Sequence, residues 1–191
     1  MRDAVAVSAP TEPGAGDVRR HAERHATTHG AGVDRTDEWE RLRSTYLLPP
    51  GRRPASSARG VHHCALLSSD VERTIQFFQG LLGFPLIELF ENRDYRGSTH
   101  FFFDIGHGNA LAYFDFPGLE LEPYREVLGG HHHLAISVEP ANWELLRQRL
   151  VDAGIEFVLV DGTSLYLRGP DGERVELIAD PLGEMYGSSL G

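Results

Sequence analysis

Two widely separated stretches of the chain begin with an apolar strand pattern and then change to a helical one. Residues 61–84 (VHHCALLSSDVERTIQFFQGLLGF) begin as a short apolar strand, break at Ser-Ser-Asp, and continue as an amphipathic helix that ends at Gly83. Residues 131–155 (HHHLAISVEPANWELLRQRLVDAGI) repeat this plan and end their helix at Gly154. Such self-similarity indicates two copies of one structural unit. His63 and His133 then hold equivalent places in the two copies.

Three further strands follow the helix in each copy, so that both have the order β-α-β-β-β. Runs of β-branched and aromatic residues between turn signals place these strands at 86–90, 98–105 and 110–116, and near 156–160, 163–168 and 173–179. Each copy leaves one sheet face in need of cover. The sequence therefore predicts an α+β fold in which two βαβββ modules, 61–117 and 131–180, form one domain over 60–182.

The helix of the first module has a predicted start as well as a predicted end. Ser69 followed by Glu72 three residues later resembles a capping box, and Gly83 supplies the C-terminal stop. In the second module Pro140 lies at a favoured first-turn position. The helices are expected to begin at these residues.

The flanks of the domain have a different composition. Residues 1–34 lack sustained apolar periodicity and are predicted to be disordered, and their histidines at 21, 25 and 29 are not interpreted as a binding site. Residues 35–59 are predicted to form a short docking helix, over 37–48, and a linker. Residues 183–191 are predicted to be a C-terminal tail.

Composition restricts the partners of this 191-residue chain. Its formal net charge of -10 and the absence of a basic stripe argue against nucleic acid and anionic membranes as partners. Cys64 is the single cysteine, which excludes an internal disulfide and fits a reducing compartment. No apolar run approaches the roughly 20 residues that a membrane span needs. A cytoplasmic protein with a small-molecule substrate is expected.

Strand alternation brings a candidate metal site together. Because successive strand side chains point to opposite faces, His63 and His133 lie opposite the apolar face of their strands, and Glu176 of the last strand points to the same side. Two neutral imidazoles and one carboxylate can bind a divalent metal and leave positions open for substrate. His62, His131 and His132 are interpreted as surface or strand-end residues.

The strings HHCALLSSDVERTIQFFQGLLGF, HHHLAISV and YLRGPDGERVEL resemble the vicinal oxygen chelate superfamily, which includes glyoxalase I, bleomycin-resistance proteins, extradiol dioxygenases and fosfomycin-inactivating thiol transferases. The resemblance covers roughly residues 60–182. It implies paired modules that form a cup-shaped mixed sheet around a metal, with His63, His133 and Glu176 as ligands. Glyoxalase-like members tend to have a fourth metal ligand. Its equivalent position falls at about Ala112, and an alanine side chain cannot bind a metal.

The resemblance also implies residues around the metal. Tyr166 matches a tyrosine that contacts substrate in extradiol dioxygenases, and His100, expected to face the cup, is a candidate general base. Phe102 and Phe114 are expected to give the cup an aromatic-tolerant wall. Arg168 and Arg174 are the basic side chains expected near enough to bind a phosphonate.

These residues favour a metal-dependent, extradiol-dioxygenase-like oxidoreductase. Fe(II) is the expected cofactor, with Mn, Ni or Zn as alternatives. A glyoxalase-like lyase or isomerase, or a thiol transferase, on the same metal cup remains open, as does a binding protein that sequesters a small molecule. Because members of the superfamily often pair their modules across a dimer, a homodimer is expected.

Overall fold

The computed structural model describes residues 33–185 and 187–189, which divide into two units between Arg53 and Pro54. In the first unit, helix α2 spans Thr36–Tyr46 and a 3-10 helix, η1, spans Pro50–Arg52. The helix predicted over 37–48 is therefore present, and its docking on the domain stays a prediction. The predicted disordered segment lies almost entirely in residues 1–32, outside the described residues.

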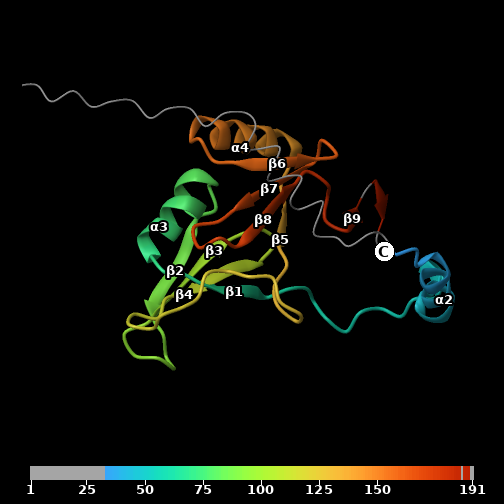
Figure 1. Cartoon of the computed structure of the whole chain (residues 1–191), viewed down its shortest axis with the longest axis horizontal. Helices are drawn as coiled ribbons and strands as arrows, with labels where there is room; N and C mark the ends of the chain where they lie inside the picture. Colours follow the sequence, from blue (N-terminus) through green and yellow to red (C-terminus); the bar gives the residue numbers. More distant parts are fainter. Residues whose placement is uncertain (1–32, 186, 190–191) are drawn as a thin grey trace, which may run out of the picture. The chain divides into compact units, whose positions relative to one another are not determined.

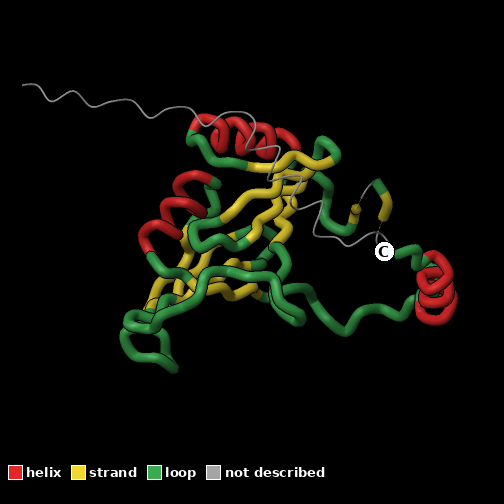
Figure 2. Tube along the Cα trace, in the orientation of Figure 1, coloured by secondary structure: helices red, strands yellow, loops and turns green. Residues whose placement is uncertain are grey.

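The second unit contains two modules with the same order of elements (Figures 1 and 2). The first consists of β1 (His63–Leu67), α3 (Val71–Ile75), a π-helical segment η2 (Gln76–Leu81), β2 (Leu86–Glu91), β3 (Thr99–Asp104) and β4 (Ala110–Phe114). The second consists of β5 (Leu134–Ser137), α4 (Pro140–Asp152), β6 (Phe157–Val160), β7 (Ser164–Arg168) and β8 (Arg174–Ile178). The predicted α+β fold of paired βαβββ modules is confirmed. Within the predicted tail, β9 (Glu184–Met185) pairs with β10 (Ser188–Ser189).

Each module forms one mixed four-stranded sheet, in the orders β1-β4-β3-β2 and β5-β8-β7-β6. The first strand of each module runs parallel to the last, and the other neighbours are antiparallel. The register is equivalent in the two sheets, since Ala65 pairs with Ala112 and Ala135 pairs with Glu176. The repeat in the sequence therefore corresponds to a repeat in strand pairing.

One hydrophobic core joins the two modules. Phe78, Phe101 and Tyr113 from the first module belong to the same buried cluster as Leu150 and Leu177 from the second. In β1, Cys64 and Leu66 pack against this core, whereas His63, Ala65 and Leu67 are exposed. The period-2 pattern predicted this division of faces.

The start of α3 differs from the expected capping box. Asp70 is the N-cap, and its carboxylate accepts a hydrogen bond from the backbone N–H of Arg73 at 3.0 Å. Ser69 instead donates to Asp171 of the other module, so a distant partner takes the hydroxyl that was predicted to cap the helix. The expected end is present, because Gly83 adopts a φ of +74°, in the left-handed region that favours glycine.

No helix among the described residues has the length and apolar character needed to cross a membrane.

Candidate metal centre

The second module brings three of the predicted site residues together. Nε2 of His133 lies 3.1 Å from a carboxylate oxygen of Glu176, and the rings of His133 and Tyr166 are 5.7 Å apart in an edge-to-face arrangement. Glu176 is only 5% exposed, and Tyr166 pairs with it across the β7–β8 ladder. An imidazole nitrogen and a buried carboxylate oxygen at this distance are both suitable ligands for one divalent cation.

The first module places the other two predicted residues on an aromatic surface. His63 contacts Phe102, with ring centroids 6.0 Å apart, and His100 stacks on Phe114 at 3.7 Å. Nε2 of His100 is buried without a hydrogen-bond partner. Burial, followed by the charge of His63, lowers the pKa of His100. A neutral imidazole with a free ring nitrogen can accept a proton.

The described residues contain no group of three or more His, Cys, Asp and Glu side chains that could hold a metal ion within one chain. His63 and His100 belong to the surface of the first module, whereas His133, Tyr166 and Glu176 belong to that of the second. The assembly of His63, His133 and Glu176 into one three-ligand site stays a prediction.

Ala112 occupies the position that corresponds to Glu176. Both pair with the second residue after the predicted histidine ligand, Ala112 with Ala65 and Glu176 with Ala135. Its methyl group is fully buried and cannot bind a metal. The first module thus has no carboxylate at this position.

The two arginines expected near the site have partners within the protein. Arg174 forms an ion pair with Glu126 at 2.6 Å, and its Nη1 lies 3.1 Å from Nε2 of His132. Arg168 donates to the carbonyl oxygen of Gly172 at 2.9 Å. The interpretation of His132 as a surface or strand-end residue therefore missed its contact with Arg174. Nothing in the sequence around Glu126 indicated that this residue forms an ion pair with Arg174.

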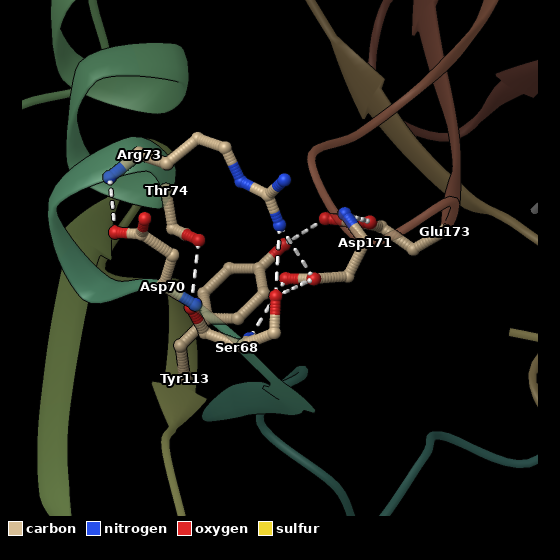
Figure 3. A network of polar contacts seen from close by, with 8 residues as sticks. Ser68, Asp70, Arg73, Thr74, Tyr113, Asp171 and Glu173 are labelled. Atoms are coloured by element: carbon tan, nitrogen blue, oxygen red, sulfur yellow. Dashed lines mark hydrogen bonds and ion pairs between the residues drawn. The ribbon is translucent and has the colours of Figure 1, made fainter. Parts of the chain in front are cut away.

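A polar bridge with a buried core joins β4 and the start of α3 in module one to the turn before β8 in module two (Figure 3). The Tyr113 hydroxyl of β4 donates to Glu173 at 2.8 Å, and Glu173 also accepts from the backbone N–H of Asp171 at 2.9 Å. The Asp171 carboxylate accepts hydrogen bonds from the backbone and hydroxyl of Ser69 and forms an ion pair with Arg73. The turn before β8, the strand that carries Glu176, is thus attached to the start of α3.

Glu173 makes the stability of the bridge dependent on pH. Burial raises the pKa of its carboxyl above the ordinary value of 4.5, so the folded protein holds this proton more tightly than the unfolded chain. The contribution of protonated Glu173 to the free energy of unfolding is therefore complete below pH 4.5, and it is lost as the pH rises through the raised pKa of the folded protein. Chemical denaturation across this window should show a steeper loss of stability in the wild type than in Glu173→Gln. Parallel curves would contradict this assignment.

Comparison with models of known protein families covers most of both modules. The family model described as Glyoxalase/Bleomycin resistance protein/Dioxygenase superfamily matches residues 60–177. The chain belongs to this superfamily, and the resemblance seen in its sequence is confirmed.

Relatives within this superfamily differ in the reactions that their names give. Metallothiol transferase FosB of Shouchella clausii (strain KSM-K16) is 26% identical over 65% of this chain and 83% of its own length. MhqA of Bacillus subtilis (strain 168), provisionally named a ring-cleaving dioxygenase, is 24% identical over 67% of this chain and 42% of its own length.

Solved structures share the fold at low sequence identity. The fosfomycin resistance protein FosX from Mesorhizobium loti is 21% identical, with a TM-score of 0.51 over 65% of this chain and 94% of its own. A glyoxylase/bleomycin resistance protein/dioxygenase domain from Frankia sp. EAN1pec, also 21% identical, has a TM-score of 0.56 over 65% of this chain and all of its own. These likenesses define the architecture and leave the reaction open.

Proposed function

We propose that this protein is a divalent-metal-dependent enzyme that acts on a small molecule able to chelate the metal through oxygen, with an extradiol-dioxygenase-like reaction favoured. The contact between His133 and the buried carboxylate of Glu176 carries this proposal. Completed by His63, the set becomes two histidines and one carboxylate, the arrangement typical of non-haem Fe(II) oxygenases. Bound there, Fe(II) would supply binding positions for O2 and for substrate oxygens and acidify a substrate hydroxyl.

The third ligand is proposed to come from a second copy of the chain. In a single chain His63, Ala65 and Leu67, which share one face of β1, are exposed. Ala135, two residues after His133 in module two, is exposed as well. A two-fold dimer that brings the surface of module one against module two of its partner would make two identical sites. The homodimer expected from the superfamily would therefore be required for metal binding.

Mixing two inactive variants tests this arrangement. Glu176→Gln and His63→Ala homodimers should each lack intact sites, whereas their heterodimers should contain one intact site of two. Equal amounts, mixed and allowed to exchange subunits, should therefore recover about a quarter of wild-type metal binding. Subunit exchange is verified by native mass spectrometry with one variant isotope-labelled. No recovery among confirmed heterodimers would contradict a shared site.

The chain's own residues support an aromatic substrate. Phe102, His100 and Phe114 form a continuous set of ring contacts beside His63, a surface suited to stacking against a planar ring. His100 would accept a proton from a ring hydroxyl, and Tyr166 would donate a hydrogen bond to a substrate oxygen. Both atoms of O2 enter the ring-opened product, so the reaction needs no external reductant.

Oxygen uptake is the deciding measurement. Protein purified anaerobically and loaded with Fe(II) should consume O2 with at least one member of a catechol panel, and His100→Gln should lower kcat by about 100-fold, a typical effect of removing a general base. His107→Asn, an exchange at an exposed turn histidine, serves as the control. Absence of O2 uptake across the panel would remove the dioxygenase proposal.

A thiol transferase is the second candidate, and the FosB relatives favour it. Its phosphonate substrate would need free basic groups, but Arg174 and Arg168 are already engaged with Glu126 and with Gly172. Transfer of a thiol to fosfomycin by the Mn(II)-loaded protein under anaerobic conditions would select this function. A lyase or isomerase would likewise act without O2. Unchanged ligand affinity in a His63→Ala, Glu176→Ala double variant would instead indicate sequestration.

A further inference from the structure

The connector between the two modules, residues 118–130, is fastened to the second module by the side chain of Tyr124. Its hydroxyl donates to the carbonyl oxygens of His131 at 2.6 Å and His132 at 2.9 Å, so that one proton is shared between two acceptors. These carbonyl groups belong to the two residues that precede His133, the candidate ligand, which itself lies one position before β5. The backbone that carries the ligand is therefore held by a side chain of the connector.

The first module holds the equivalent carbonyl group in another way. There the carbonyl oxygen of His62, which precedes His63, accepts a hydrogen bond from the backbone N–H of Ala110 in β4 at 3.2 Å. β1 begins at His63, whereas β5 begins only at Leu134, one position later in the repeat. In module two the Tyr124 hydroxyl thus donates at the place where a neighbouring strand donates in module one.

Two arginines of the second sheet fix the connector in this position. Arg168 and Arg174 are partners across the β7–β8 ladder. The Arg168 guanidinium lies 5.9 Å from the centroid of the Tyr124 ring, within the range of a cation–π contact. Arg174 forms an ion pair with Glu126 at 2.6 Å, and Nε2 of His132 lies 3.1 Å from Arg174 and 3.9 Å from Glu126. The connector therefore reaches the starts of both β5 and β8.

The starts of these strands carry two of the candidate metal ligands. His133 precedes β5, and Glu176 is the third residue of β8. Nε2 of His133 lies 3.1 Å from a carboxylate oxygen of Glu176. Two ligand atoms that are each about 2.1 Å from one metal ion lie about 3.0–3.4 Å apart in octahedral or tetrahedral coordination. The observed separation therefore fits one ion bound by both side chains, and a shift of either strand start would change it.

We propose that the connector is a clamp over the starts of β5 and β8, which holds His133 and Glu176 at the spacing required for metal binding. Tyr124 and Glu126 are the positioning residues of this clamp. The first acts through the backbone before His133, and the second acts through Arg174. Outer partners of this kind orient the ligands and strengthen metal binding. The metal-binding part of this inference rests on the proposed function, whereas the clamp itself does not.

Backbone motion tests the clamp in the metal-free protein. In Tyr124→Phe, which removes only the hydroxyl, the amide order parameters of His132 and His133 should fall from the rigid level of about 0.85 toward about 0.6. Tyr46→Phe removes the hydroxyl of an exposed tyrosine at the end of α2 and should leave these order parameters unchanged. Wild-type order parameters in Tyr124→Phe would overturn the clamp.

Metal affinity provides the second measurement. By titration calorimetry, Tyr124→Phe should bind Mn(II) about 10-fold more weakly than the wild type. Glu126→Gln, which breaks the ion pair with Arg174, should also bind Mn(II) more weakly, by a smaller factor. Glu122→Gln removes a carboxylate of the same connector that is paired with Arg125, and it should match the wild type.

Chemical denaturation separates positioning from a general loss of stability. Wild-type affinity for Mn(II) in a folded Tyr124→Phe variant would refute the positioning role, even if the variant were less stable. Glu126→Gln, altered at a side chain that is 43% exposed, decides the role in the same way if Tyr124→Phe does not fold. If the wild-type protein bound no metal, the proposed function would fail, while the order parameters of His132 and His133 would still decide the clamp.

Discussion

Exchange of Glu176 for glutamine is expected to weaken divalent metal binding by about 100-fold or more while leaving the fold intact. Glutamine keeps the size of the side chain in its buried position, where glutamate is 5% exposed. It removes the negative charge that faces His133 at 3.1 Å. The measurement is metal content after anaerobic purification, followed by calorimetric titration of the metal-free protein with Fe(II) and Mn(II).

Two comparisons make this result specific. Glu184→Gln removes an exposed carboxylate of β9 and should bind metal like the wild type. His133→Ala should lose the metal as Glu176→Gln does, because it removes the other ligand of the same half-site. Wild-type metal content in both site variants would show that the metal is held elsewhere.

Exchange of Gly169 for alanine is expected to lower the free energy of unfolding by about 3 kcal/mol, which combines overpacking with lost hydrogen bonds. A Cβ at this position would lie 2.3 Å from the carboxyl carbon of Glu173 and equally close to one of its oxygens. The buried carboxylate would have to move away from Tyr113 and from the backbone of Asp171. Chemical denaturation measures the change.

Gly80→Ala is the matched control for this substitution. Gly80 lies in η2, a Cβ there meets nothing within 4 Å, and alanine should stabilise the helix by about 0.5–1 kcal/mol. Tyr113→Phe provides a further check, because it removes the hydroxyl that contacts the same carboxylate. Its cost of about 1–3 kcal/mol should not add fully to that of Gly169→Ala. Equal effects of the two glycine substitutions would contradict the role of Gly169.

Much of the site followed from local rules of strand geometry. Alternation along β1 placed His63 opposite Cys64, and the repeat placed His133 in the same position of module two. The register then shows that Ala112 corresponds to Glu176, as the sequence predicted. The faces depend on a two-residue period, which is a property of short segments, and the correspondence of Ala112 with Glu176 follows from applying that period to both copies of the repeat.

The wider arrangement depended on contacts that no local pattern encodes. Ser69 was predicted to cap a helix, but Asp171, distant in sequence, takes its hydroxyl. The contact of Arg174 with His132 joins residues that are 42 positions apart in the chain.

By itself, the sequence determined the two βαβββ modules and the face of each candidate ligand, because hydrophobic periodicity and the repeat can be followed along the chain without its fold. Tertiary structure alone decided that the start of α3 binds Asp171 of module two, and that the described residues of one chain gather no group of three His, Cys, Asp or Glu side chains able to hold a metal. The physical reason is that the relative placement of the modules depends on one shared core and on the buried bridge of Tyr113 and Glu173, and these form only when both halves pack together.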